Sequence, residues 1–179
     1  MGQSPELVVL LSEAGEPIGT ANKADVHTTD TALHQAFSCH VFNASGRILV
    51  TRRALAKKTW PGVWTNSFCG HPAPGEDDVE AIIRRAQFEL GLRISSIQVA
   101  LPDFRYRAVD ASGIVENEIC PVYTAIADGE PEPNPDEVAE YYWANPQELL
   151  VAVDAANFAF SPWLTLQLPR LAEAGILAR

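Results

Sequence analysis

The chain has 179 residues, of which 47% are hydrophobic and 20% charged, and its formal net charge at pH 7 is −10. This length and apolar content predict a single globular domain over residues 1–179 with a substantial core. The acidic balance repels nucleic acid and anionic membranes, and no apolar run approaches the roughly 20 residues that span a bilayer. We therefore expect neither nucleic acid nor a membrane as a partner.

Cysteine content and the first residues indicate the cell compartment. The three cysteines are an odd number without CxxC spacing, which argues against a disulfide framework and against a structural zinc ribbon. The opening segment, MGQSPELVVLLSEAGEP, has no basic leader before its short apolar run. We expect a cytoplasmic monomer with at least one free thiol.

The first quarter of the chain predicts strands joined by turns. They are a strand at 6–11 with a turn at 13–17, and a hairpin of strands 36–42 and 47–51 around the turn 43–46. Between them, residues 22–35 contain His27 and His34, which would share a face in a helix. Several threonines weaken that helix, so the conformation of 22–35 stays open.

The most irregular stretch is 59–76, TWPGVWTNSFCGHPAPGE, where proline and glycine interrupt both helical and strand periodicity. Such a loop usually carries function. Cys69 and His71 lie two apart, so an extended backbone would aim both side chains to one side. The pair is either a thiol beside a metal ligand, or a buried cysteine and a capping histidine in a proline-rich turn.

Positive charge concentrates immediately before this loop. Arg52, Arg53, Lys57 and Lys58 place four of the chain's 13 basic residues within seven positions. A solvated basic face is the usual explanation of an isolated cluster. In an acidic chain, next to an irregular loop, we instead expect an anion site.

A helix is predicted after the loop. Asp77 or Asp78 can cap it, Gly91 stops it, and its apolar positions follow three-four spacing at Val79, Ile82, Ile83, Ala86 and Leu90. Arg85 and Glu89 are four residues apart on this helix, and a surface ion pair is the ordinary explanation for them.

Strands are predicted next at 103–109 and 114–127, separated by the turn 110–113. Alternation in the second strand places Glu116, Glu118 and Cys120 on one face. Two carboxylates in an otherwise apolar segment repel each other and lose hydration, costs that a bound cation would remove. The alternative is an exposed acidic edge.

The C-terminal part predicts a surface loop at 128–137, a strand at 139–143, a helix at 146–153 and a last helix beginning at Ser161 and Pro162. We expect this last helix to run to about Leu168, where Pro169 should break or kink it. Trp163 lies at its start and either packs in the core or lines the mouth of a pocket.

Several stretches together are similar to a known family. They are HTTDTALHQAFS, LVTRRALAKKTWPGVWTNSFCGHPAPGE, DFRYRA, SGIVENEICPVY and FAFSPW, in this order and over nearly the whole chain. The sequence resembles the type I isopentenyl diphosphate isomerases, which are metal-dependent and need no flavin. The resemblance implies a Nudix-like α/β/α sandwich with a mixed β-sheet. It also implies isopentenyl diphosphate as the substrate.

The relation to Nudix hydrolases can be tested on the Nudix box. Matching positions are Gly70, Glu76, Arg84, Glu89, Gly91 and Leu92. Arg85 and Phe88 stand where two of the box acids should be. Because those acids hold the metals of hydrolases, the departure argues against diphosphate hydrolysis while keeping the fold.

The resemblance implies a metal site at His27, His34, His71, Glu116 and Glu118. Three imidazoles and two carboxylates suit zinc, manganese or iron more than magnesium. A second ion, Mg²⁺, is expected to bridge the substrate diphosphate, with Glu89 and the Cys69 backbone carbonyl nearby. His40 matches no ligand position and is expected to be structural, as are the core thiols Cys39 and Cys120.

The resemblance also implies catalytic and binding roles. Cys69 and Glu118 are the proton-transfer groups, with Glu118 and Tyr106 at the alkene terminus and Cys69 at C2. Trp163 is the aromatic that faces the carbocation. The expected diphosphate-binding residues are Lys23, Arg53, Lys57 and Arg85. The alternatives are a Nudix-type diphosphohydrolase and a non-catalytic metal- or diphosphate-binding module.

Overall fold

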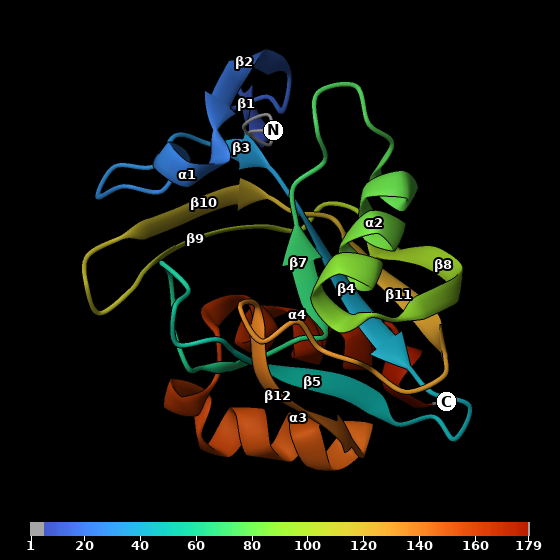
Figure 1. Ribbon diagram of the computed structural model, residues 1–179. Coiled ribbons are helices and arrows are strands. Elements are labelled where there is room, and N and C mark those ends of the chain that lie inside the picture. Colours follow the sequence, from blue (N-terminus) through green and yellow to red (C-terminus); the bar gives the residue numbers. More distant parts are fainter. Residues whose placement is uncertain (1–5, 179) are drawn as a thin grey trace.

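The computed structural model describes residues 6–178 (Figure 1). Its strands are β1 (Leu7–Leu11), β2 (Pro17–Asn22), β3 (His34–Gln35), β4 (Phe37–Phe42), β5 (Ile48–Arg53), β6 (Trp64–Thr65), β7 (Phe68–Gly70), β8 (Arg93–Leu101), β9 (Arg105–Val109), β10 (Val115–Ile119), β11 (Val122–Asp128) and β12 (Val138–Ala144). Its helices are α1 (Lys23–Val26), α2 (Asp78–Leu90), α3 (Pro146–Ala155) and α4 (Pro162–Glu173), with 3₁₀ helices η1 (Asn157–Ala159) and η2 (Ile176–Ala178).

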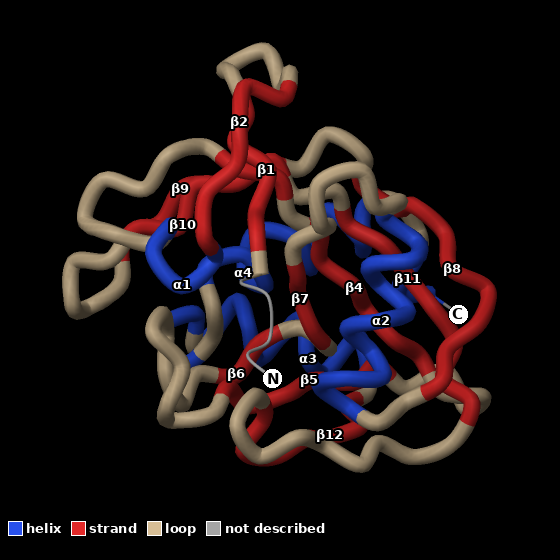
Figure 2. The backbone as a smooth tube through the Cα atoms, turned by 45° about the horizontal axis from the view of Figure 1, so that its top comes forward, coloured by secondary structure: helices blue, strands red, loops and turns tan. Residues whose placement is uncertain are grey.

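The strands described form two mixed sheets. One has five strands in the order β2-β1-β3-β10-β9. The other has seven strands and follows the order β12-β5-β4-β11-β8, with β6 on β5 and β7 on β4. Figure 2 shows β9, β10 and α1 on one side of the molecule and the β4, β8 and β11 strands on the other.

Two chain segments run through both sheets. The parallel pair β3 and β10 continues directly into the parallel pair β4 and β11. At the junction Ala36 N donates to Ile119 O and Ser38 N donates to Pro121 O, which keeps the two segments paired. As a result, residues of the two sheets meet in one place, at the ends of β3 and β10 and the start of β4.

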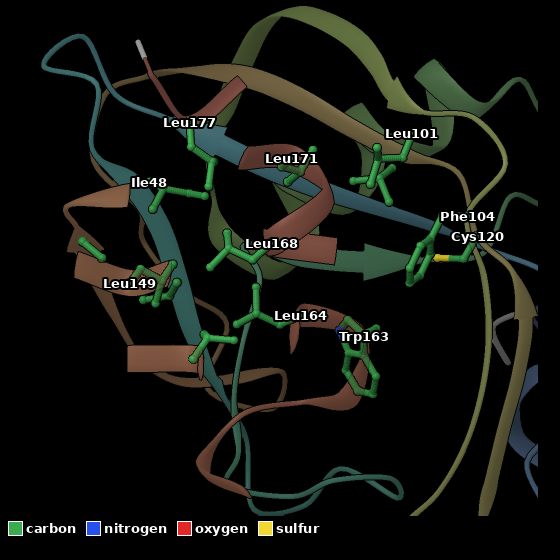
Figure 3. Close-up of a cluster of buried hydrophobic side chains, with 14 of the residues drawn as sticks. Ile48, Leu101, Phe104, Cys120, Leu149, Trp163, Leu164, Leu168, Leu171 and Leu177 are labelled. Carbon is green, nitrogen blue, oxygen red and sulfur yellow. The ribbon is translucent and has the colours of Figure 1, made fainter. Parts of the chain in front are cut away.

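Helices cover both faces of the seven-stranded sheet, as the predicted sandwich requires (Figure 1). On one face α2 packs Ile82, Ala86 and Leu90 against Phe37 and Val41 of β4. On the other face α3 and α4 bury a cluster that includes Leu149, Leu164 and Leu168 (Figure 3). Trp163 lies at the end of this second cluster, one residue before Leu164.

Local capping explains where two of the helices begin and end. The Asp77 side chain accepts from Val79 N at 2.8 Å, and α2 ends at Gly91, whose φ of +57° is the left-handed conformation that glycine adopts without strain. Ser161 caps α4 and Pro162 occupies its first turn. The predicted caps of both helices are confirmed.

The α2 faces differ from the prediction. Ile82, Ala86 and Leu90 are buried as expected, but Val79 and Ile83 are exposed. Arg85 and Glu89 are instead buried, at 3% and 7% exposure. The expectation of a surface ion pair is therefore wrong, because the pair lies on the inward side of the helix and lines a cavity.

Several predicted boundaries are also corrected. The predicted strand 114–127 is two strands, β10 and β11, divided at Cys120 and Pro121 where the chain passes between sheets. The loop 59–76 contains the short strands β6 and β7, and the sequence analysis did not predict β8. The helix α4 continues past Pro169 to Glu173, since Leu168 and Leu171 on either side of the proline are both fully buried.

The segment left open, residues 22–35, holds the four-residue helix α1, then loop, then β3. Asn22 caps α1 by accepting from Ala24 N. Among residues 6–178, no helix combines the length and apolar character needed to cross a membrane.

Candidate active site

A cavity of about 690 Å³ opens between the two sheets and the C-terminal half of α2. Most of the predicted site residues line it: Lys23, His27, Arg53, Lys57, Cys69, His71, Arg85, Glu89, Tyr106, Glu116, Glu118 and Trp163. His34 is fully buried behind this wall. The fold thus collects residues from at least six separate segments around one space.

Three histidines and a glutamate converge on one side of the cavity. His27 follows α1, His34 is in β3, His71 follows β7 and Glu118 is in β10, and one ligand atom from each lies within 4.8 Å of the others. Glu118 Oε1 is 3.4 Å from His34 Nε2 and 3.2 Å from His71 Nε2. These residues are up to 91 positions apart, from 27 to 118, and the β3–β10 pairing brings them together.

Glu116 joins this group through His27. Its Oε2 lies 2.8 Å from His27 Nε2, and its Oε1 accepts from Thr59 Oγ1 at 2.7 Å. Glu116 and Glu118 are 6% and 5% exposed. The alternative of an exposed acidic edge on this strand is wrong.

Buried polar atoms without partners indicate that these residues fit a divalent metal. Within residues 6–178, His27 Nε2, His34 Nε2 and Glu116 Oε2 make no hydrogen bond of good geometry, although His27 Nε2 lies 2.8 Å from Glu116 Oε2 and His34 Nε2 lies 3.4 Å from Glu118 Oε1. His34 Nδ1 donates to Ala32 O at 2.9 Å, so its Nε2 carries a free lone pair. Unpaired buried polar atoms are costly, and a cation at their meeting point would satisfy them.

The ionisation of this cluster agrees with metal ligation. Burial lowers the pKa of His71 to about 4, so its imidazole is neutral at pH 7. Burial alone would raise the pKa of Glu118, but hydrogen bonds and charges from His34 and His71 hold that pKa well below its usual range. Burial lowers the pKa of His34, but the hydrogen bond and charge of Glu118 outweigh it and raise that pKa. Glu118 and His71 are therefore a carboxylate and a neutral imidazole, the forms that bind metals.

Cys69 lies on β7 and lines the same cavity. Its Sγ is 3.2 Å from Ser38 Oγ and donates to Asn66 Oδ1 at 3.3 Å. Burial raises the pKa of Cys69 to about 12, so the group is a thiol at neutral pH. Gln167 Nε2 donates to Ser38 Oγ, which leaves the serine hydroxyl to donate to the sulfur.

Tyr106 and Trp163 line the cavity with their aromatic rings, and together with Trp60, which packs against Trp163, we call them the aromatic floor. The rings of Tyr106 and Trp163 are 5.7 Å apart, and those of Trp60 and Trp163 are 5.4 Å apart. Tyr106 is the direct cross-strand neighbour of Glu118 in the β9–β10 pair. Trp163 is 2% exposed, so both explanations of this residue hold: it packs in the core and lines the cavity.

Basic side chains also line the cavity, and we call the part lined by Lys23, Arg53, Lys57 and Arg85 its basic end. Each of them is held by a partner, and the Arg53 guanidinium also lies 5.3 Å from the centroid of the Trp163 ring. Lys23 pairs with Glu6 at 2.6 Å, and Lys57 pairs with Glu137. Arg85 pairs with Glu89 and lies 3.5 Å from Glu137. Arg53 donates two hydrogen bonds to Thr59 O.

Not every predicted residue joins the group expected of it. Glu89, expected near a second ion that bridges the diphosphate, lines the cavity and is paired with Arg85. Arg52 pairs with Glu140 and does not line the cavity, although its neighbours in the basic cluster, Arg53, Lys57 and Lys58, do. His40 is buried and its Nε2 bonds Gln167 Oε1 at 2.9 Å, away from the other histidines, as expected of a structural residue.

Several buried polar residues around the site were not predicted. They are Ser38, Thr59, Asn66 and Gln167. Thr59 and Asn66 lie in the irregular loop, and polar residues in an otherwise functional loop were the available signal. Ser38 and Gln167 gave none, because single polar residues in apolar segments do not reveal their partners.

Comparison with known proteins gives consistent relatives. The NUDIX domain matches residues 32–164. An isopentenyl-diphosphate Delta-isomerase of Clavibacter sepedonicus is 67% identical over 171 residues, covering 96% of this chain and 90% of that protein. Proteins of the same name from Kocuria rhizophila and Citrobacter koseri are 59% and 57% identical and cover 96% and 90% of this chain, and 96% and 90% of their own lengths.

Solved structures show the same fold at low identity. A crystal structure from Deinococcus radiodurans aligns with a TM-score of 0.71 at 23% identity, covering 92% of this chain and 98% of that one. A MutT protein from Methanosarcina mazei aligns with a TM-score of 0.62 at 16% identity, covering 80% and 95%. At such identities the likeness concerns the fold alone.

Proposed function

The chain belongs to the isopentenyl-diphosphate Delta-isomerase family and carries a NUDIX domain, and we propose that it moves the double bond of its substrate by a metal-dependent 1,3-proton shift in the cavity described above. The reaction interconverts isopentenyl diphosphate and dimethylallyl diphosphate through a tertiary carbocation. One observation carries this mechanism: Cys69 and Glu118 line the same cavity, with Tyr106 and Trp163 in its wall.

Protonation starts the reaction in the forward direction. We assign to the protonated form of Glu118 the transfer of a proton to the terminal alkene carbon, C4, which leaves a carboxylate and a tertiary cation at C3. His34 and His71 favour the carboxylate in the unliganded site, so the forward direction begins with protonation of Glu118. Glu118 Oε1 faces His34 and His71, so the second carboxyl oxygen is available for this step. Tyr106, paired with Glu118 across the strands, assists it.

Deprotonation at C2 completes the shift. We assign this step to Cys69 in its thiolate form, whose sulfur takes the proton and becomes a thiol as the C2–H electron pair forms the C2=C3 bond. Because burial favours the thiol, Cys69 must lose its proton before each forward turnover. The substrate gains one proton at C4 and loses one from C2, so its composition and oxidation state are unchanged overall. In the reverse direction the roles exchange, because each group then holds the proton that the other needs.

The aromatic floor protects the cation. The face of an indole attracts a positive charge and contributes about 2 kcal/mol or more when desolvated. Trp163 is almost fully buried, so it can approach C3 while excluding water that would trap the cation. The indole ring also has no free lone pair that would add to the cationic carbon.

The basic end of the cavity binds the diphosphate in this proposal. Lys23, Arg53, Lys57 and Arg85 all line it, and a diphosphate would replace part of their pairing with glutamates. Binding energy from this non-reacting end then orients the alkene between Glu118 and Cys69. Arg85, at a position of a Nudix-box acid, would serve anion binding.

Metal occupancy follows from the donor set. His27, His34, His71, Glu116 and Glu118 would hold one divalent ion, Mn²⁺ or Zn²⁺, since imidazoles suit these metals. Mg²⁺ would accompany the diphosphate, near Glu89 and the Cys69 carbonyl, because it prefers oxygen and keeps few protein ligands. When bound, the first ion supplies positive charge that makes an adjacent carboxylic acid more acidic.

We further propose that the chain acts as a single-domain, cytoplasmic monomer without a nucleic-acid or membrane partner and without flavin. The net charge of −10 supports the lack of a nucleic-acid partner and of binding to anionic membranes. The core clusters on the two faces of the seven-stranded sheet support one domain. Size-exclusion chromatography with light scattering tests the monomer, and a dimer mass would contradict it.

Proton NMR in D₂O tests the reaction. The purified protein is incubated with isopentenyl diphosphate, Mg²⁺ and Mn²⁺, without flavin. We expect dimethylallyl diphosphate carrying deuterium from the solvent. Release of inorganic phosphate or isopentenyl monophosphate would indicate a hydrolase, and unchanged substrate with metal bound would indicate a binding module.

A further inference from the structure

A buried asparagine lies between the thiol and the tryptophan. Asn66 connects β6 to β7 and is fully buried. Its Nδ2 donates to Cys39 O at 3.1 Å and to Phe68 O at 2.7 Å. Both amide hydrogens are thus used on backbone carbonyls, which fixes the plane and the direction of the side chain.

The other end of this amide contacts the proposed catalytic groups. Asn66 Oδ1 accepts from Cys69 Sγ at 3.3 Å and from Trp163 Nε1 at 2.9 Å. An indole N–H only donates, so the oxygen must face Trp163. A flipped amide would set its NH₂ against that N–H and its oxygen against two carbonyls, so the observed orientation is the favourable one.

The same oxygen also accepts a hydrogen bond from Thr65, which in turn contacts the N-cap residue of α4. Thr65 Oγ1 donates to Asn66 Oδ1 at 2.9 Å and lies 2.7 Å from Ser161 Oγ, the N-cap of α4. The first turn of α4 carries Trp163. The loop that holds the thiol and the helix that holds the indole are therefore joined at one atom.

We propose that Asn66 is a positioning residue that holds the Cys69 thiol and the Trp163 indole in one fixed relation. The proposal rests on the roles assigned to Cys69 and Trp163 under the proposed function. The sulfur must reach C2 while the ring lies against the adjacent cationic carbon. Cys69 and Trp163 come from elements 94 positions apart, from 69 to 163, and a shared acceptor sets their separation.

A surface asparagine in this chain provides a matched control. Asn43 Oδ1 accepts from Ser45 N, Ser45 Oγ and Arg47 N in the exposed turn between β4 and β5. Like Asn66, it organises a local segment by accepting several bonds at one oxygen. It contacts no residue that lines the cavity, so its replacement reports the effect of losing such a hub on the fold alone.

The test compares Asn66→Ala, Asn66→Asp, Asn43→Ala and Cys69→Ala, each loaded with metal, by kcat and KM separately. We expect Asn66→Ala to lower kcat about 10²-fold, the effect of a misplacement near 1 Å, with KM nearly unchanged. Asn66→Asp keeps an accepting oxygen and should recover part of kcat. Asn43→Ala should leave both constants unchanged.

Two results would overturn the proposal: a normal kcat for Asn66→Ala, or Asn66→Asp no better than Asn66→Ala in a folded protein. Cys69→Ala separates this from a failure of the proposed function. If Cys69→Ala is inactive while Asn66→Ala is normal, only the positioning role fails. If Cys69→Ala turns over normally, the assigned role of the thiol fails, and the positioning role fails with it.

A measurement on the unsubstituted protein covers variants that do not fold. Proton–nitrogen NMR of the indole groups, with Trp163 assigned through Trp163→Phe, reports the exchange of the Trp163 Nε1 proton with water. We expect slow exchange because this proton is buried and bonded to Asn66 Oδ1. Exchange as fast as that of an exposed indole would overturn the proposal.

Discussion

The histidine cluster and the basic residues of the cavity differ in how their buried polar and charged groups are paired. At the histidine cluster, His27 Nε2, His34 Nε2 and Glu116 Oε2 make no hydrogen bond of good geometry in the described part of the chain, although each lies within 3.4 Å of another group of the cluster. At the basic end, Lys57 pairs with Glu137 and Arg85 with Glu89. The first pattern needs a ligand to be satisfied, whereas the second is satisfied without one.

The difference indicates two kinds of binding. A site whose buried atoms lack partners gains from a permanently bound ion, because without the ion these atoms stay unpaired. A site whose charges already pair can exchange partners, so an anion can arrive and leave with each turnover. We therefore propose that a metal resides at the histidine cluster and that the diphosphate binds transiently among the basic residues.

The largest expected effect tests the histidine cluster. Glu118→Gln should lower kcat about 10⁴-fold and reduce the metal bound at the histidine cluster, because one residue serves both proton transfer and ligation. Elemental analysis and NMR turnover measure the two effects. Glu89→Gln is the matched control and should keep the metal at the histidine cluster. Normal metal content together with normal rates in Glu118→Gln would refute the shared role.

The variant Cys69→Ala tests whether the Cys69 thiol is a catalytic acid–base group. We expect a loss of about 10²- to 10⁴-fold in kcat, the range for general acid–base groups, with the melting temperature little changed. Cys39→Ala serves as the control, since this thiol is fully buried in the α2-side core and should cost stability while sparing turnover. A Cys69→Ala protein with nearly normal turnover would exclude an acid–base role for the thiol.

The ion pairing at the basic end can be tested by removing one partner of the pair formed by Arg85 and Glu89. Glu89→Leu should destabilise the protein by about 3 kcal/mol in urea unfolding, because it leaves the buried Arg85 guanidinium with Glu137 as its nearest carboxylate, 3.5 Å away. The double variant Arg85→Leu, Glu89→Leu removes both charges and should regain most of the stability. If single and double variants are equally unstable, mutual compensation of the charges is the wrong account.

The smallest expected change in kcat concerns Trp163 in the aromatic floor. Trp163→Ala should lower kcat by the equivalent of about 2 kcal/mol or more, whereas Trp163→Phe retains a ring face and should keep much more activity. Steady-state kinetics of both variants decides the point, with circular dichroism to confirm the fold. Equal losses in the two variants would argue against contact between the ring and a cation.

Local signals made much of the secondary structure predictable. The caps at Asp77, Gly91 and Ser161 were read correctly because capping depends on residues within one turn of a helix end. The break between β10 and β11 was not predicted, because it results from the change of sheet at Pro121. Strand β8 was missed for a related reason: its residues are mostly exposed, so its apolar pattern is weak.

The sequence indicated which residues belong to the site, but not which of them contact one another. Alternation alone placed Glu116 and Glu118 on one face and suggested a cation. Their meeting with His27, His34 and His71 came from the resemblance to a family, since no local spacing joins residues so far apart. The buried pair of Arg85 and Glu89 was misjudged, because ions at this spacing are usually exposed.

By itself the sequence determined the residue types of the chemistry, the caps of the helices and the family. These depend on composition, short-range spacing and order along the chain. Only the tertiary structure decided that α2 turns Arg85 and Glu89 inward, and that Asn66 joins Cys69 to Trp163. Burial and long-range hydrogen bonds depend on how sheets and helices pack, and packing brings together residues whose separation in the chain carries no signal.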